Sequence, residues 1–215
     1  MLPTGPSTAL LAAQHGLTEL RMPAPGAPGQ AVARADPSGR IDGRLAVDDA
    51  TAVGGRIAVQ VTDGYGYHEH LVIAGHPQVS YGGGNASLVG SMTTQDDGIW
   101  ATTGSSGRPR AGPLVRLSPS LRVITPRAVS VNPVLRRAEQ VWSHGSTVWV
   151  ASAAAGHQLV CFSYRGRMGS LATVGVHGQP AALAAAGDTI YVSFRISGSG
   201  ATSDVRAYPV PAVCR

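Results

Sequence analysis

The densest group of residues that could do chemistry lies between positions 62 and 70, which read Thr-Asp-Gly-Tyr-Gly-Tyr-His-Glu-His. In an extended segment alternate side chains point the same way, so His68 and His70 would project to one side and Glu69 to the other. Two imidazoles at this spacing could share a metal ion. Zinc sites use more than two protein ligands, however, and the sequence holds no second His or Cys pair with ligand spacing. We therefore predict no metal and no cofactor, and expect these three residues to contact a ligand.

Other loop residues could contribute to the same ligand site. Tyr65 and Tyr67 alternate with glycines, and tyrosine rings offer a broad contact surface at a small cost in entropy. Arg108 and Arg110 lie in a Gly/Ser/Pro-rich segment, and two arginines beside a central channel would attract an anionic ligand. The remaining candidates are His157, His177 and Arg195. An ordinary exposed loop side chain stays the alternative for each of them.

Nucleophile and phosphate-binding motifs are absent from the sequence. Gly104-Ser105-Ser106-Gly107 departs from the Gly-x-Ser-x-Gly spacing and does not lead from a strand into a helix, as a nucleophile elbow requires. Gly82-Gly83-Gly84-Asn85 precedes no helix whose dipole would bind a phosphate. No catalytic residue is assigned. The sequence favours a non-catalytic domain that binds or senses a small ligand, a glycan or a protein.

These candidates lie between strands of a repeated β pattern. A turn residue, an apolar β-former and an aromatic recur around Ile99, Val148 and Ile190, and more faintly around Ile57. The intervals are 42, 49 and 42 residues. Such a period is typical of architectures that build one four-stranded sheet per repeat. We expect an all-β fold in which these four residues occupy equivalent, buried second strands.

The second strand of each repeat is apolar almost without interruption. A half-buried strand alternates apolar and polar residues, whereas the stretches 99–101 and 148–151 do not, which indicates burial on both faces. Trp100, Trp149 and Tyr191 recur at the same place in the repeat. We expect all three aromatic rings to lie in the core between neighbouring sheets, as they would in a β-propeller of four-stranded antiparallel blades.

One motif carries a resemblance to known families. Asp97-Gly98-Ile99-Trp100 matches the Asp-Gly-apolar-Trp turn of the NHL, quinoprotein-like and streptogramin-lyase-like propellers, and the resemblance covers residues 44–215. It implies a radial arrangement of antiparallel blades. It also implies the alternative function, a metal-dependent lyase with channel-facing His and Glu side chains. The residues that could serve such a lyase are His68, Glu69, His70, His157 and His177.

The repeats predict a single domain over residues 1–215. Residues 1–43 form a degraded or partial first blade, 44–85, 86–134 and 135–179 form full blades, and 180–215 form an incomplete last blade. About five blades are visible. The ring is expected to be open or closed by a sheet that the two termini share, or the chain is an incomplete fragment of a larger ring. An open blade edge would attract other chains.

Composition and the two cysteines allow predictions about the partners and the location of the protein. All 17 basic residues are arginines and they are scattered, so the net charge of +5 predicts no nucleic-acid partner. No apolar run reaches about 18 residues, which predicts no membrane span, and the first residues show no signal peptide. Cys161 and Cys214 could form a disulfide or remain buried thiols. We suspect an extracytoplasmic location, which a disulfide would favour.

Overall fold

The computed structural model describes residues 2–5, 8–13, 16–21, 30–35, 46–62, 69–73, 76–82, 87–104, 111–176, 178–195 and 202–215. In this part of the chain the strands form five antiparallel sheets, each made of strands that follow one another in sequence. Helix is limited to single turns: α1 (Arg127–Ser130), η1 (Leu135–Arg137) and η2 (Ala212–Cys214). None of the described helices is long enough to cross a membrane. The all-β prediction is confirmed.

Three sheets have four strands and two have three. The first sheet holds β1 (Leu2–Gly5), β2 (Thr8–Ala13), β3 (Gly16–Arg21) and β4 (Gln30–Ala35). The second holds β5 (Ala46–Val53), β6 (Arg56–Thr62), β7 (Glu69–Ile73) and β8 (His76–Gly82). The third holds β9 (Ser87–Gln95), β10 (Gly98–Gly104) and β11 (Leu114–Leu117). The fourth holds β12 (Ala138–His144), β13 (Thr147–Ser152), β14 (Gln158–Tyr164) and β15 (Met168–Val174). The fifth holds β16 (Pro180–Ala186), β17 (Thr189–Arg195) and β18 (Thr202–Pro209).

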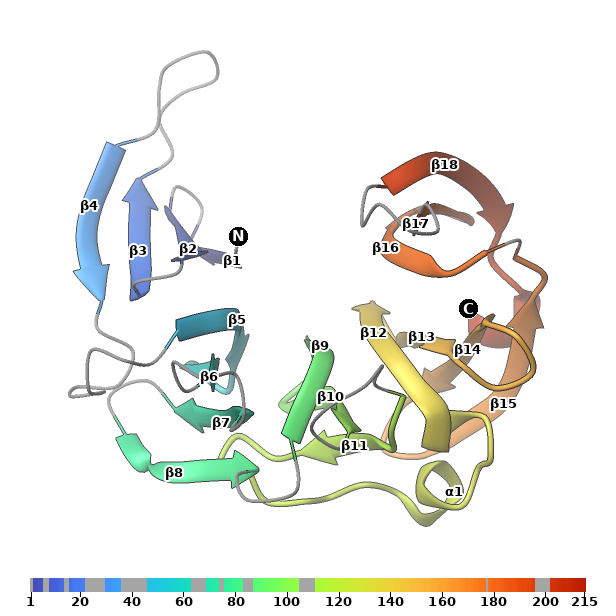
Figure 1. Ribbon diagram of the computed structural model, residues 1–215, viewed down its shortest axis with the longest axis horizontal. Helices are drawn as coiled ribbons and strands as arrows, with labels where there is room; N and C mark the ends of the chain where they lie inside the picture. Colours follow the sequence, from blue (N-terminus) through green and yellow to red (C-terminus); the bar gives the residue numbers. More distant parts are fainter. Residues whose placement is uncertain are drawn as a thin grey trace.

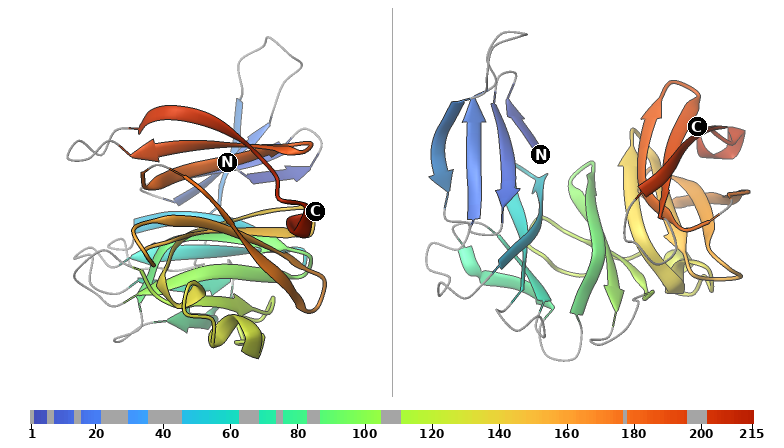
Figure 2. Two further views of the ribbon diagram at one scale, coloured as in Figure 1. Left: turned by 90° about the vertical axis from the view of Figure 1, so that its right-hand side faces the viewer. Right: turned by 45° about the horizontal axis from the view of Figure 1, so that its top comes forward.

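The sheets follow one another along an arc, with β1, β5, β9, β12 and β16 on its inner side (Figure 1). The first and last sheets stand apart at the two ends, and the further views in Figure 2 show the same separation. Described strands near the two termini pair only within their own sheets. A closed propeller, or one closed by a sheet that the termini share, is therefore not what the structure shows.

The third sheet has three strands, so the full blade predicted over residues 86–134 lacks its outer strand, and residues 121–124 take its place. This segment makes only an isolated bridge, between Val123 and Leu117. A tight turn interrupts it, because the Leu121 amide donates to the Ser118 carbonyl and Leu121 has φ 59°. The Leu121 side chain is buried in the apolar core instead of continuing a ladder. The chain then passes into α1.

The predicted equivalence of the second strands is confirmed by the strand register. Ile57 pairs with Ala52 across a two-residue turn. Ile99, Val148 and Ile190 each pair, across their own two-residue turn, with the residue whose position corresponds to that of Ala52. Ile99, Val148 and Ile190 are fully buried, whereas Ile57 is only half-buried.

The aromatic side chains of these strands lie in two different environments. Trp100 and Trp149 are buried at 0% and 1% exposure, as expected. Tyr191 is 44% exposed, so its predicted place in the core is wrong. A further sheet packs on the strands that carry the two tryptophans, but β17 belongs to the last sheet of the arc (Figure 1). With no sheet beyond it in the described chain, one face of β17 remains exposed.

Short hydroxyl side chains connect the inner strands of neighbouring sheets. Thr51 on β5 bonds to Thr94 on β9 at 3.3 Å, and Thr93 bonds to Ser143 on β12 at 2.8 Å. The Ser143 hydroxyl also donates to the Thr94 carbonyl at 2.5 Å. These bonds satisfy polar groups that the sheet ladders leave free on the inner side of the arc. The inner seam is therefore polar, and the apolar core lies further out.

A buried guanidinium lies in the junction between the third and fourth sheets. Arg116 is 3% exposed, and its Cζ lies 4.2 Å from the Tyr164 ring centroid and 5.3 Å from that of Trp100. Its Nη2 donates to the Gln95 carbonyl at 3.4 Å and lies 3.7 Å from the exposed Asp97 carboxylate. Nε and Nη1 have no hydrogen-bond partner among the residues that the structure describes. The two rings are therefore the main compensation for the lost hydration of this cation.

We expect Tyr164→Leu to lower the free energy of unfolding by about 2 kcal/mol or more, because a desolvated cation–π contact is worth about that amount. Tyr164→Phe is the matched control. It keeps the ring over Arg116 and should cost at most about 1 kcal/mol, the usual worth of one hydroxyl hydrogen bond. Urea denaturation followed by Trp fluorescence measures both. Equal losses for the two variants would show that the ring does not stabilise the cation.

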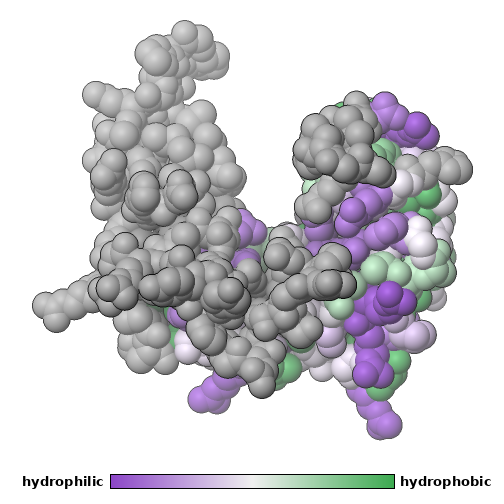
Figure 3. All heavy atoms as spheres, in the orientation of Figure 1, coloured by the Kyte–Doolittle hydropathy of each residue, from purple (hydrophilic) through white to green (hydrophobic). Residues whose placement is uncertain are grey.

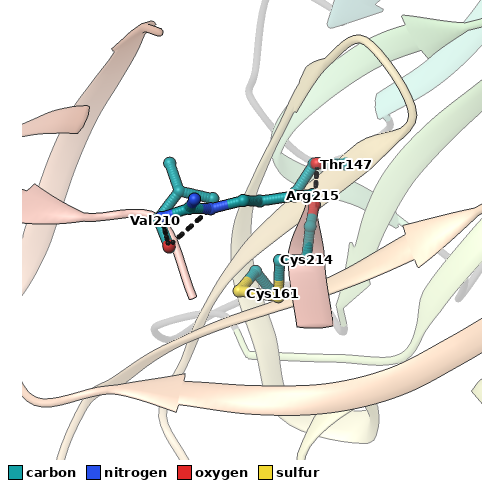
Figure 4. Close-up of a disulfide and its surroundings, with 5 residues drawn as sticks. All are labelled: Thr147, Cys161, Val210, Cys214 and Arg215. Atoms are coloured by element: carbon teal, nitrogen blue, oxygen red, sulfur yellow. Dashed lines mark hydrogen bonds between the residues drawn. A yellow bond between two sulfur atoms is a disulfide. The ribbon is translucent and has the colours of Figure 1, made fainter. Parts of the chain in front are cut away.

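The sequence left open whether the two cysteines pair, and the structure shows that they do. Cys161 on β14 and Cys214 in η2 form a disulfide with Cα atoms 5.9 Å apart. The Thr147 hydroxyl donates to the Cys214 carbonyl, and the Arg215 guanidinium donates to the Val210 carbonyl (Figure 4). These contacts attach the C-terminal residues to the fourth sheet.

Replacing both cysteines with alanine should lower the free energy of unfolding by roughly 4 kcal/mol, since the bridge closes a long loop in the unfolded chain. The measurement is chemical denaturation with and without a reducing agent. The reductant should bring the wild-type protein to the stability of the variant and leave the variant unchanged. Two titratable thiols in the denatured, unreduced wild-type protein would contradict the bridge.

Candidate functional site

Most of the predicted ligand-contacting residues belong to the connections between second and third strands. Tyr65, Tyr67, His68, Arg108, Arg110 and His177 lie outside the described residues. Glu69 and Arg195 are described by strand position alone, Glu69 as the first residue of β7 and Arg195 as the last of β17. His70 is half-buried within β7, opposite Val61 and Gly82.

His157 is the predicted candidate that the structure places in a defined polar contact. It lies in the connection from β13 to β14, and its Nδ1 is 3.1 Å from Oε2 of Glu139. The Glu139 side chain is 10% exposed and the His157 side chain is 41% exposed. The carboxylate is thus largely shielded while the imidazole reaches solvent. We take this His157–Glu139 pair as the candidate functional site.

An irregularity in β12 presents Glu139 to the histidine. Ala138 pairs with Ser152 and Gln140 with Ala151, which leaves Glu139 as an extra residue between two paired ones. A bulge of this kind re-aims a side chain and is common beside active sites. The inner strands β5 and β16 shift register at the corresponding place, at residues 48 and 181. Sequence reasoning missed Glu139 because a bulge leaves no mark in the hydrophobic pattern.

The loop that carries His157 has an unusual backbone. Ala155, Gly156 and His157 are consecutive residues with φ values of 46°, 84° and 69°. The left-handed region is unfavourable for residues with a side chain, and such strain concentrates at functional sites. The turn places the imidazole beside a carboxylate that stands 18 positions earlier in the chain.

The pair has the arrangement of an oriented general base. A carboxylate that accepts a hydrogen bond from Nδ1–H fixes the histidine tautomer and leaves Nε2 as the basic nitrogen.

The surroundings of the pair are polar and ordered. A second contact holds the start of β12 in place, because the Thr102 hydroxyl donates to the Glu139 carbonyl at 3.4 Å. Hydrophilic side chains gather along the inner edge of the described half of the molecule in Figure 3. Among the described residues no group of three or more His, Cys, Asp or Glu could hold a metal ion.

A second acidic group lies on the inner side of the arc. Asp49 on β5 directly follows the bulge at residue 48, and its Oδ1 accepts a hydrogen bond from the Ala50 amide at 2.8 Å. Burial raises the pKa of Asp49 above its ordinary value of 3.8, although the amides of Ala50 and Met92 act in the opposite direction. Desolvation of the charged form is the larger effect.

The raised pKa of Asp49 makes a prediction about stability against pH. The folded protein holds this proton to a higher pH than the unfolded chain does, so stability falls as pH rises from 3.8 through the folded pKa. We expect Asp49→Asn to raise the melting temperature at pH 7, because the amide keeps an oxygen acceptor for Ala50 without the buried charge. The gain should shrink as pH falls toward 4. Calorimetry between pH 3.5 and 7 measures it, and a variant less stable than wild type at pH 7 would contradict the assignment.

A small cavity lies at the opposite end of the fourth and fifth sheets. Its volume is about 220 Å³, and its lining residues come from the β12–β13 and β16–β17 hairpins and from the C-terminal segment. Trp149 and Val210 supply apolar surface, while Arg215 and Asp188 form an ion pair at 3.1 Å. The side chains of Arg215 and Asp188 are 49% and 72% exposed, so this ion pair adds little to stability. Neither His70 nor His157, the predicted site residues whose side chains the structure describes, lines this cavity.

The similarity of this chain to known proteins is at the level of the fold. No family model matches the sequence, and no curated protein is significantly similar to it. A solved structure of luciferin-regenerating enzyme is similar with a TM-score of 0.54 and 15% sequence identity. The match covers 96% of this chain and 75% of that one. The two proteins therefore share an all-β fold.

These findings correct two predictions. The resemblance to NHL, quinoprotein-like and streptogramin-lyase-like propellers is wrong, because no family model supports it and the described sheets form no closed ring. The predicted non-catalytic binding or sensing domain is wrong as well, since a solved structure that shares this fold is that of an enzyme. The streptogramin-lyase-like alternative rested on the same resemblance and fails with it. The short turn motif around Trp100 indicates a packed hairpin, and it is not specific to a particular family.

Proposed function

We propose that the protein is an enzyme that uses His157 as a general base oriented by Glu139. The observation that carries this proposal is the 3.1 Å contact between Nδ1 of His157 and Oε2 of Glu139, made by a shielded carboxylate and an exposed imidazole. The strained loop and the bulge in β12 support it, because both position these two side chains.

The proposed architecture is propeller-like, with the five sheets as blades of one domain over residues 1–215. The arc of sheets and the equivalent second strands support this arrangement (Figure 1). Strands β6, β10, β13 and β17 end on the same side of the arc as His157. The substrate would approach from this side, where Glu69 and Arg195 also stand at strand ends.

The reaction that fits an oriented base is hydrolysis of an activated carbonyl. Nε2 of His157 accepts a proton from a water molecule as the water oxygen attacks the carbonyl carbon. The Glu139 carboxylate stabilises the imidazolium through the Nδ1–H bond. The proton then passes from Nε2 to the leaving oxygen as the bond between carbon and that oxygen breaks, which restores the neutral base.

The substrate is proposed to be a small molecule, in keeping with the fold shared with luciferin-regenerating enzyme. An extracytoplasmic location is also proposed. Its support is the Cys161–Cys214 disulfide, since disulfides persist in oxidising compartments.

The test is hydrolysis of p-nitrophenyl acetate by the purified protein and its variants. His157→Gln should lower the rate by about 100- to 10,000-fold, the usual contribution of a general base. Glu139→Gln should also lower it, because the amide cannot stabilise the imidazolium. His144→Gln is the matched control, since this exposed histidine ends β12 at the other end of the sheet. A rate that falls equally with His144→Gln would contradict the proposal.

A further inference from the structure

The fifth sheet ends one strand earlier than most of its neighbours. Its order is β16–β17–β18, and among the described residues β18 pairs with β17 alone. The first, second and fourth sheets continue to a fourth strand at this place. In the third sheet the place is filled by residues 122–124, which exchange backbone bonds with Arg116 and Ser118. The outer edge of β18 is therefore an open position for one more strand.

The backbone of β18 presents alternate peptide groups to this edge. The Val210 amide donates to the Asp188 carbonyl at 2.8 Å, so these two residues form a hydrogen-bonded pair. In an antiparallel ladder such pairs alternate with pairs that exchange no bonds. The register is regular from Pro209 back to Val205. The amide and carbonyl groups of Val205 and Ala207 therefore point away from β17, where a further strand could bond to them.

The side chains along this edge are exposed on both faces of the strand. Asp204, Val205, Arg206 and Ala207 are all exposed, Val205 at 71%. Asp204 and Arg206 lie on one face, because Nη2 of Arg206 is 2.7 Å from Oδ2 of Asp204. The edge thus offers an apolar side chain on one face, and two opposite charges two residues apart on the other face.

This order of charges is complementary to itself. When two copies of β18 pair antiparallel about Val205, each Arg206 stands opposite Asp204 of the other copy. The two Val205 amides then donate to each other's carbonyls, and the two valine side chains lie side by side. In the neighbouring register, in which Val205 bonds to Ala207, the two Arg206 side chains would face each other. Like charges directly opposite are destabilising, so the charges favour the pairing about Val205.

We infer that β18 pairs with β18 of a second copy of this chain. The two fifth sheets then form one continuous sheet, and a single junction on a two-fold axis closes the dimer. The strand β18 is the one farthest from the inner strand β16, so the second copy approaches from outside the arc (Figure 1). This inference goes beyond the proposed function and does not rest on it.

The first test is the oligomeric state of the full chain, measured by sedimentation over a range of concentrations. We expect a dimer that Val205→Pro abolishes, because proline has no amide hydrogen for the bond on the two-fold axis. The bonds between β18 and β17 are kept, since the Val205 amide takes no part in them. Val205→Thr keeps the amide and is the matched control, which should remain a dimer. A monomer at every concentration, or a dimer that Val205→Pro does not weaken, would overturn the inference.

The second test exchanges the charges and needs no proline. Asp204→Arg and Arg206→Asp should each raise the dissociation constant of the dimer by about 10-fold or more, because like charges then face each other twice across the axis. The double variant Asp204→Arg/Arg206→Asp restores opposite charges at both places and should return the dissociation constant close to that of the wild type. Melting curves of the monomers check that each variant is folded. A double variant as weak as the single variants would overturn the pairing about Val205.

Discussion

The structure depends on one constraint: the second strands are too apolar to leave either face in water. Along β10 and β13 the side chains are buried on both sides, including Trp100 and Trp149. Burying apolar surface is worth about 25 cal/mol per Å², so each of these strands needs a partner sheet on each face. Sheets that must be covered on both sides stack one after another. The arc in Figure 1 is the consequence of this requirement, repeated along the chain.

This stacking brings the inner strands close together and leaves their polar groups on the inner side of the arc. Threonine and serine hydroxyls satisfy many of these groups across the sheet boundaries, as between Thr93 and Ser143. A bulge interrupts the regular alternation of β12 and turns Glu139 toward His157. The site therefore lies at a break in the regular strand pattern, and packed strands on both sides hold it in place. Rigid strands give the carboxylate its position, and the strained loop gives the imidazole its position.

The last sheet of the arc shows what happens when the constraint is not met. The face of β17 that carries Tyr191 has no neighbouring sheet in the described chain and remains exposed. On the opposite face the C-terminal segment packs against the fourth sheet, held by the Cys161–Cys214 bridge. The covalent bond fixes this segment where few strand hydrogen bonds are available. In the junction between the third and fourth sheets, the buried Arg116 guanidinium relies on the Trp100 and Tyr164 rings to compensate for its lost hydration.

The sequence alone determined the local structure: the all-β class, the equivalent second strands and the burial of Trp100 and Trp149. These follow from the spacing of apolar residues and turns, which acts over a few positions and is visible without the fold. His157 was recognised as a candidate, but its partner Glu139 was not, because a bulge and a left-handed loop decide that they meet. The exposure of Tyr191, the open arc and the pairing of the cysteines were likewise decided by tertiary structure. Each depends on which sheet stands next to which, and this information is carried by contacts between residues far apart in the chain.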